Sequence, residues 1–148
     1  MTAITLASTD DLPRLLPLVE AFHEEAGIDV TPEARMAGLA PLLDNSPYGA
    51  VWLIGPNRAP IGYVVVCFGW AIEFGGMDGF VDELYIRPSV RSRGIGTEVL
   101  TNLPKELSKN GLKALHLEVS RVAIRSQEAY KRAGFKARSD YMLMTRKL

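Results

Sequence analysis

The sequence has little cysteine, little histidine and no excess of charge of either sign, and each shortage narrows what the protein can be. Its only cysteine, Cys67, cannot form a disulfide within the chain, which excludes a disulfide-based scaffold. The 17 basic and 17 acidic side chains cancel, so no net charge attracts nucleic acid or an anionic membrane. One cysteine and two separated histidines give no metal-site spacing, and no metal is expected.

Long hydrophobic runs are also missing. The longest uncharged apolar-rich stretch covers residues 61–72, and these twelve residues fall short of the roughly 20 that a membrane helix needs. No basic residue precedes Asp10, which does not suit a signal peptide. We therefore expect a cytoplasmic protein with no membrane partner and no nucleic-acid partner. Its 148 residues, 47% of them hydrophobic, favour a single domain over residues 1–148 with a sizeable core.

Apolar periodicity and turn residues predict the order of the elements. Strands are expected over residues 4–6, 49–54, 61–70, 80–87, 114–119 and 141–146. Helices are expected after a cap at Thr9 or Asp10, from Thr31 to about Pro41, from Gly94 or Ile95 to about Asn110, and over 123–133. The glycine-rich residues 75–79 are expected to form a flexible connection. This order predicts an α+β fold with one mixed, mostly antiparallel sheet flanked by helices.

The segment from Asp82 to Thr97 is the one that indicates chemistry. It joins a strand to a helix through a loop that holds Arg91, Arg93, Gly94 and Gly96. Glycines at a helix start let backbone N–H groups approach a ligand, and the helix dipole favours an anion there. The two arginines can add charge-assisted hydrogen bonds to phosphate oxygens. The simpler alternative is a strand-to-helix turn that carries surface arginines.

Arg91-x-x-Gly94-x-Gly96 resembles the acyl-CoA-binding signature of the GNAT N-acetyltransferases. The resemblance extends to Ala129-Tyr130-Lys131-Arg132-Ala133-Gly134-Phe135, which is similar to the late helix of that family, and to the element order of nearly the whole chain. It implies a GNAT-like fold and direct transfer of the acetyl group of acetyl-CoA, the co-substrate, to a primary amine of a small molecule or peptide. A homodimer through the last strands or helix faces is also in keeping with the family.

The resemblance assigns roles to particular residues. Backbone groups of the strand at Leu84, Tyr85 and Ile86 would bind the pantetheine arm, and one N–H there would face the thioester carbonyl. The pyrophosphate loop would consist of Arg91, Ser92, Arg93, Gly94, Ile95, Gly96 and Thr97. Tyr130 resembles the general acid that protonates the departing thiolate, although a tyrosine on an amphipathic helix is more commonly a packing residue.

Asp82 and Glu83 are the candidates for removing a proton from the acceptor amine. An alkylamine has a pKa near about 10 and is mostly protonated at neutral pH, so it needs a base before it can attack. Neighbouring strand residues face opposite sides of the sheet, so only one of the two can face the cleft unless a bulge intervenes. The sequence does not choose between them, and a structural salt bridge is the alternative for either.

The sequence departs from the family pattern at Ala123 and at Pro104, a proline inside the helix that follows the loop. Ala123 stands where many members have an asparagine that helps to hold the pantetheine arm. His23, Glu24 and Glu25 end the first helix, near the family's acceptor site, and are interpreted here as a solvated helix face, with attraction of a cationic amine as the alternative. A second function also stays open, a non-catalytic acyl-CoA-binding module, but Tyr130 and the acidic pair favour an enzyme because binding alone requires neither.

Overall fold

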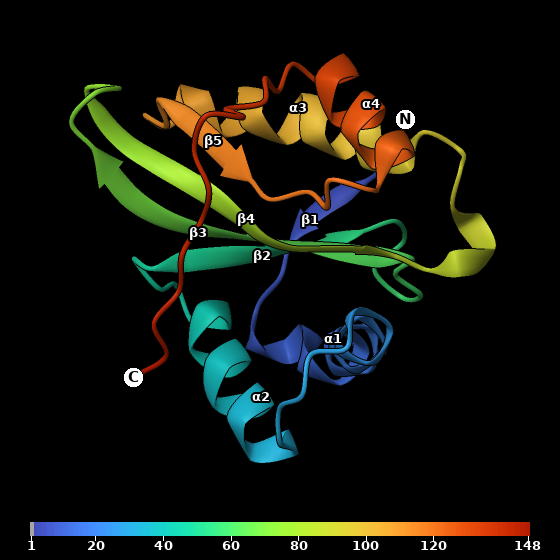
Figure 1. Ribbon diagram of the computed structural model, residues 1–148. Helices are drawn as coiled ribbons and strands as arrows, with labels where there is room; N and C mark the ends of the chain where they lie inside the picture. Colours follow the sequence, from blue (N-terminus) through green and yellow to red (C-terminus); the bar gives the residue numbers. More distant parts are fainter. Residues whose placement is uncertain (1) are drawn as a thin grey trace.

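In the computed structural model, which describes residues 2–148, helices cover both faces of one five-stranded sheet (Figure 1). The strands are β1 (Ile4–Leu6), β2 (Gly49–Ile54), β3 (Gly62–Ala71), β4 (Gly76–Ile86) and β5 (Ala114–Leu117). The α-helices are α1 (Leu12–Ala26), α2 (Pro32–Leu39), α3 (Ile95–Lys109) and α4 (Ile124–Arg132). No helix within residues 2–148 is long and apolar enough to cross a membrane.

The strands lie in the order in which they occur along the chain, β1-β2-β3-β4-β5. The first three pairings are antiparallel and the last, between β4 and β5, is parallel. The expected α+β fold with a mixed, mostly antiparallel sheet is therefore confirmed. The parallel pairing requires a crossover, and α3 supplies it between β4 and β5.

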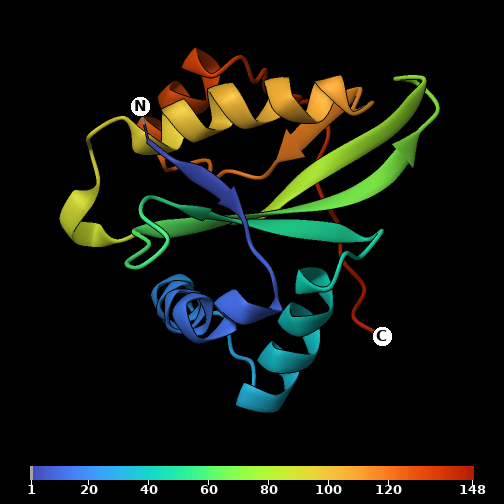
Figure 2. The same cartoon turned by 180° about the vertical axis from the view of Figure 1, so that it is seen from behind.

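The two faces of the sheet bury two separate hydrophobic clusters. On β3, Tyr63 and Val65 pack with α1 residues such as Leu15, whereas Val64 and Val66 pack with α3. Alternate side chains of a strand point to opposite faces, so a strand that is covered by helices on both sides must be apolar throughout. Figures 1 and 2 show α1 and α2 on one side of the sheet and α3 and α4 on the other.

The helix starts follow local sequence signals. Thr31 caps α2, where its Oγ1 accepts a hydrogen bond of 3.1 Å from the backbone N–H of Ala34. Before α1, the Asp11 carboxylate accepts a hydrogen bond of 2.8 Å from the backbone N–H of Ser8, so the capping residue is Ser8 and not Thr9 or Asp10. A short 3₁₀ turn over Thr9–Asp11 leads into α1.

Two expectations about the strands are wrong. Residues 75–79 do not form a flexible connection, because β4 already begins at Gly76 and pairs with β3 out to Ala71. Within residues 2–148, the segment 141–146 forms no strand, and its one backbone hydrogen bond joins the Tyr141 N–H to the Arg138 C=O. A strand needs a paired edge, and this segment instead runs past the sheet towards α2 (Figure 1).

Candidate active site

The sheet opens between β4 and β5 halfway along β4. The parallel pairing ends at Val81 and Leu117, but β4 continues to Ile86. The Arg87 N–H donates a hydrogen bond of 2.8 Å to the Ile61 C=O. This bond shows which residues of β4 direct their N–H and C=O groups towards β3, because every second residue of a strand does so. It follows that the backbone groups of Tyr85 point to β3, and those of Leu84 and Ile86 point into the opening. Of the three predicted backbone positions, two therefore face the opening.

The loop after β4 brings the start of α3 to the end of this opening. Ser92 and Gly94 have positive φ angles of 63° and 78°, and Gly94 is the residue that caps α3. The first N–H groups of the helix, at Ile95, Gly96 and Thr97, have no partner within the helix. A Cβ atom placed on Gly94 or Gly96 would meet no atom within 4 Å. The loop thus offers backbone donors and open space, as a pyrophosphate group requires.

The two arginines of the loop differ in their surroundings. Arg91 donates two hydrogen bonds of 2.5 Å to the carboxylate of Glu25 on α1, and its Nε donates one of 2.8 Å to the Ile86 C=O. Its guanidinium carbon also lies 5.4 Å from the centre of the Tyr85 ring. The hydrogen bond from Arg91 lowers the pKa of Glu25, and that from Glu25 raises the pKa of Arg91. Both arginines are exposed, and Arg91 links the loop to α1.

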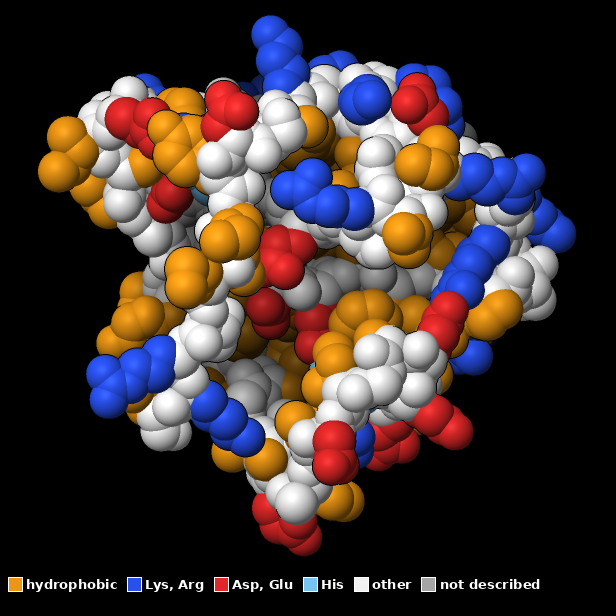
Figure 3. Space-filling view, viewed as in Figure 1, with side chains coloured by type: hydrophobic (Ala, Val, Ile, Leu, Met, Phe, Trp, Pro, Cys, Tyr) orange, Lys and Arg blue, Asp and Glu red, His pale blue; other side chains and the backbone are white. Residues whose placement is uncertain are grey.

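A bulge in β4 brings Asp82 and Glu83 to the same cavity. Val65 of β3 faces Glu83 but Val66 faces Val81, so Asp82 is one extra residue on β4. This extra residue breaks the alternation that would otherwise place neighbouring side chains on opposite faces. Both carboxylates line a cavity of about 220 Å³ between the sheet and helices α1 and α2. Figure 3 shows acidic side chains around a hollow in the middle of this face.

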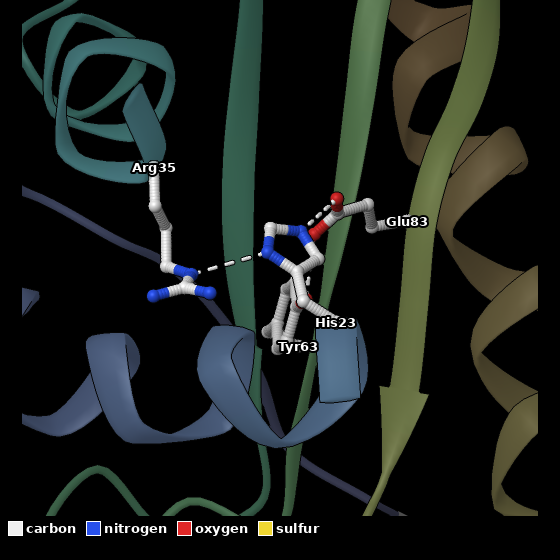
Figure 4. A network of polar contacts seen from close by, with 4 residues as sticks. All are labelled: His23, Arg35, Tyr63 and Glu83. Atoms are coloured by element: carbon white, nitrogen blue, oxygen red, sulfur yellow. Dashed lines mark hydrogen bonds and ion pairs between the residues drawn. The ribbon is translucent and has the colours of Figure 1, made fainter. Parts of the chain in front are cut away.

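Glu83 is held by a network of polar side chains (Figure 4). Its Oε1 accepts a hydrogen bond of 2.7 Å from the Tyr63 hydroxyl, and its Oε2 lies 2.7 Å from His23 Nε2. Arg35 Nε donates to His23 Nδ1 at 3.2 Å, so Nδ1 is the unprotonated acceptor and the hydrogen on Nε2 points at Glu83. Burial, followed by the negative charge of Glu83, raises the pKa of Tyr63 well above its usual range.

Sequence reasoning missed Tyr63 and Arg35, and it misinterpreted His23. His23 is only 7% exposed, so its interpretation as part of a solvated helix face is wrong. The position lies four residues after Val19, which is also buried, and this spacing places both side chains on the inner face of α1. This helical spacing is the sequence signal that would have predicted a buried His23. The hydrogen bond to Glu83 could not be read from the sequence because 60 residues separate the two.

Asp82 differs from Glu83 in having no hydrogen-bond partner among residues 2–148. Its side chain is exposed to the cavity, but the protein around it removes part of its hydration. This loss of hydration, followed by the charges of Glu83 and Glu118, raises the pKa of Asp82. A carboxylate with unoccupied oxygens and a raised pKa is suited to accept a proton.

Tyr130 lies on α4 against the hydrophobic cluster that α3 shares with the sheet. Its ring packs edge-on against Phe135, with 6.4 Å between the ring centres. Burial raises the pKa of the Tyr130 hydroxyl, so the phenol keeps its proton at neutral pH. Tyr130 is therefore a packing residue, as the sequence analysis allowed. Packing holds its ring in place, and the hydroxyl makes no hydrogen bond to residues 2–148.

The turn before α4, which contains Ala123, is closed by the side chain of Gln127. The amide group of Gln127 donates hydrogen bonds of 2.8 Å to the Ser120 C=O and 2.9 Å to the Arg121 C=O. Both amide hydrogens are thereby used to close the segment between β5 and α4.

The matching family profile is that of the acetyltransferase (GNAT) family, and it covers residues 18–135. The opening between β4 and β5 lies beside the loop and the helix start at which the resemblance to this family predicts coenzyme binding. The chain belongs to the GNAT family, as its sequence motifs predicted. No curated protein is significantly similar to it in sequence.

Solved structures agree with this assignment. An integron cassette protein from the mobile metagenome of Cole Harbour Salt Marsh is 32% identical, with a TM-score of 0.83 over 98% of this chain and 90% of that chain. Ribosomal-protein-alanine N-acetyltransferase from Brucella melitensis biovar Abortus 2308 is 18% identical, with a TM-score of 0.77 over 100% and 99%. AAC(6')-Iy in complex with a bisubstrate analogue of CoA is 14% identical, with a TM-score of 0.78 over 100% and 99%. The last two show likeness of fold alone.

Proposed function

We propose that the protein is an acetyl-CoA-dependent N-acetyltransferase that acts on a primary amine by direct transfer. The observation that carries this proposal is the second half of β4, which pairs with β3 but is open on the side of β5, with the first turn of α3 at one end and the acidic cavity beside it. The pyrophosphate would bind at residues 91–97, and the pantetheine arm would bind the backbone of Leu84 and Ile86. The acceptor amine would enter from the cavity that Asp82 and Glu83 line.

The reaction then needs three contributions from the chain. Asp82 takes a proton from the ammonium group, and the neutral nitrogen attacks the thioester carbon. A backbone N–H of β4 stabilises the charge on the carbonyl oxygen, a contribution worth roughly 3–4 kcal/mol in comparable sites. As the carbon–sulfur bond breaks, the Tyr130 hydroxyl donates its proton to the thiolate, and the second proton lost by the attacking nitrogen restores this hydroxyl. The products are the N-acetylated amine and CoA.

Acetyl-CoA binding is tested by thermal melting of the wild type and of Gly96→Leu. In the wild type, acetyl-CoA at 100 times its Kd should add about 2.7 kcal/mol to the free energy of unfolding. The leucine side chain meets no protein atom near its Cβ, so the unliganded variant should melt at the wild-type temperature or above it. Acetyl-CoA should not raise the melting temperature of the variant, because the leucine side chain projects into the proposed pyrophosphate site. An unshifted wild type at millimolar ligand would contradict the proposal.

The alternative is an acyl-CoA-binding module without catalysis. Such a module would need the open strand and the loop, but it would have no use for an unpartnered carboxylate with a raised pKa beside the opening. Asp82 is therefore the feature that favours the enzyme. Acetyl-CoA stabilisation without release of thiol on any small amine, peptide or aminoglycoside would instead support the module.

We also propose a homodimer in which residues 141–148 of one copy lie along β5 of the other. This segment exposes the apolar side chains of Tyr141, Met142, Leu143 and Met144. Among residues 2–148, no strand lies along the outer edge of β5, and Leu115 of β5 and Phe135 line a cavity of about 340 Å³. An open edge and an unpaired apolar segment with a strand-like sequence complement each other.

Light scattering after size-exclusion chromatography tests the dimer. The full chain should have twice the mass of one chain, and deletion of residues 141–148 should halve it. Met142→Glu combined with Met144→Glu should do the same in a chain of full length. A monomeric full chain, or a dimer that persists in both variants, would contradict this arrangement.

A further inference from the structure

The cavity beside the bulge is lined by side chains of opposite charge. The carboxylates of Asp82 and Glu83 lie on β4, and the guanidinium of Arg35 enters from α2. Arg35 Nε donates to His23, but the two terminal nitrogens of the guanidinium have no partner among residues 2–148. A guanidinium with free donors in a cavity wall is suited to bind a carboxylate in a two-pronged manner.

Most of the remaining wall is apolar. It comes from α1, the following loop, α2 and β3, with the side chains of Val19, Ile28, Val30, Leu39, Leu42 and Val65. These side chains leave no further hydrogen-bonding groups for a polar ligand such as a sugar. A ligand that fills the cavity must therefore present an uncharged apolar group to this wall, in addition to its charged ends.

The spacing of the charges limits the length of the ligand. The imidazole ring of His23 lies between the Arg35 guanidinium and the Glu83 carboxylate (Figure 4). Its Nδ1 is 3.2 Å from Arg35 Nε, and its Nε2 is 2.7 Å from Glu83 Oε2. The amine and the carboxylate of an α-amino acid are attached to one carbon and span a similarly short separation. A polyamine would instead place a second positive charge against Arg35.

We propose that the acceptor is an α-amino acid with an aliphatic or thioether side chain, bound by Asp82 and Glu83 at its amine and by Arg35 at its carboxylate. This inference rests on the proposed acetyltransferase function. The new bond joins the amino nitrogen to the acetyl carbon, the carbon–sulfur bond breaks, and the proton lost by the amine leaves through Asp82. The product keeps its carboxylate but no longer has an ammonium group, so the acidic pair attracts it less and it dissociates.

Steady-state kinetics with L-leucine and with 3-methylbutylamine, which lacks the carboxylate, test this assignment. Arg35→Gln should raise the KM for leucine about 10–100-fold, the range expected for loss of a charge-assisted interaction. It should leave the KM for 3-methylbutylamine unchanged. Each substrate is compared between the wild type and the variant, so the difference in amine pKa cancels. Arg35→Lys should restore part of the leucine affinity, and Arg58→Gln, on the exposed turn before β3, is the matched control.

Three results would overturn the inference. An equal rise in KM for both substrates would mean that Arg35 acts only through His23. An unchanged KM for leucine would mean that no carboxylate binds at Arg35. Absence of acetylation of leucine, methionine and valine, with acetyl-CoA stabilisation intact, would exclude this acceptor class but leave the proposed function standing. Loss of acetyl-CoA stabilisation as well would overturn both.

Discussion

Tyr130→Phe should lower kcat about 10²–10⁴-fold, the usual contribution of a general acid. The substitution removes one oxygen from a ring whose position is set by packing against Phe135 and the surrounding cluster. No hydrogen bond of the Tyr130 hydroxyl to residues 2–148 is lost, so the fold and acetyl-CoA binding should persist. The KM for acetyl-CoA should accordingly change little, which separates loss of catalysis from loss of binding.

Tyr48→Phe is the matched control for this variant. Tyr48 is 77% exposed and precedes β2 outside the cavity, so its loss of a hydroxyl should leave kcat unchanged. Full activity of Tyr130→Phe would remove the tyrosine from the mechanism, and water or another group would then have to protonate the thiolate.

Asp82→Asn should also lower kcat about 10²–10⁴-fold, because the variant has no base for the ammonium proton. Most substitutions lower the free energy of unfolding, but Asp82→Asn should leave it unchanged or raise it. The pKa of Asp82 is raised in the folded protein, so its charge lowers stability once the pH exceeds that pKa. A neutral amide of the same shape removes this charge, and the variant should melt at the wild-type temperature or above.

Glu83→Gln provides the contrast to Asp82→Asn. The carboxylate of Glu83 accepts hydrogen bonds from both Tyr63 and His23. A glutamine amide nitrogen cannot accept the second of these, so a buried donor is left unsatisfied at a cost of about 1–3 kcal/mol. Thermal melting should therefore show a lower Tm for Glu83→Gln only. Equal melting curves for the two variants would contradict the different surroundings described for the two carboxylates.

The pH dependence of kcat/KM should also identify Asp82 as the base. Asp82 accepts a proton only when it is ionised, and its raised pKa moves the acid limb of the profile towards neutral pH. In Asp82→Asn this limb should disappear, and the remaining rise at higher pH should follow deprotonation of the amine. An acid limb that persists unchanged in the variant would assign the base to another group.

Local signals in the sequence predicted most of the fold. Thr31 before Pro32 marked the start of α2, and Gly94 marked the start of α3, because caps and turns depend on neighbouring residues. The loop over residues 91–97, which we propose binds the pyrophosphate, was predicted from the same kind of local signal. Residues 141–146 show the limit of this reasoning. Their strand-like pattern is real, but a strand forms only where a partner edge is available, and that is a property of the whole fold.

The arrangement of the acidic pair could not be predicted in this way. A bulge depends on the register between β3 and β4, so the sequence left open which of Asp82 and Glu83 faces the cleft, and the structure places both there. His23 and Arg35 come from two different helices and meet Glu83 only through tertiary packing. Distant residues brought together by packing leave no pattern within any one segment of the chain.

The most direct test of the proposed acetyltransferase is a product assay. The protein is incubated with acetyl-CoA and leucine, methionine or a simple alkylamine, and the acetylated amine and free thiol are both quantified by mass spectrometry and thiol titration. The proposed function predicts equal amounts of the two products with the wild type, and a strong reduction of both with Tyr130→Phe and Asp82→Asn. Thiol release that does not depend on any amine, or no acetylated amine despite acetyl-CoA binding, would contradict it.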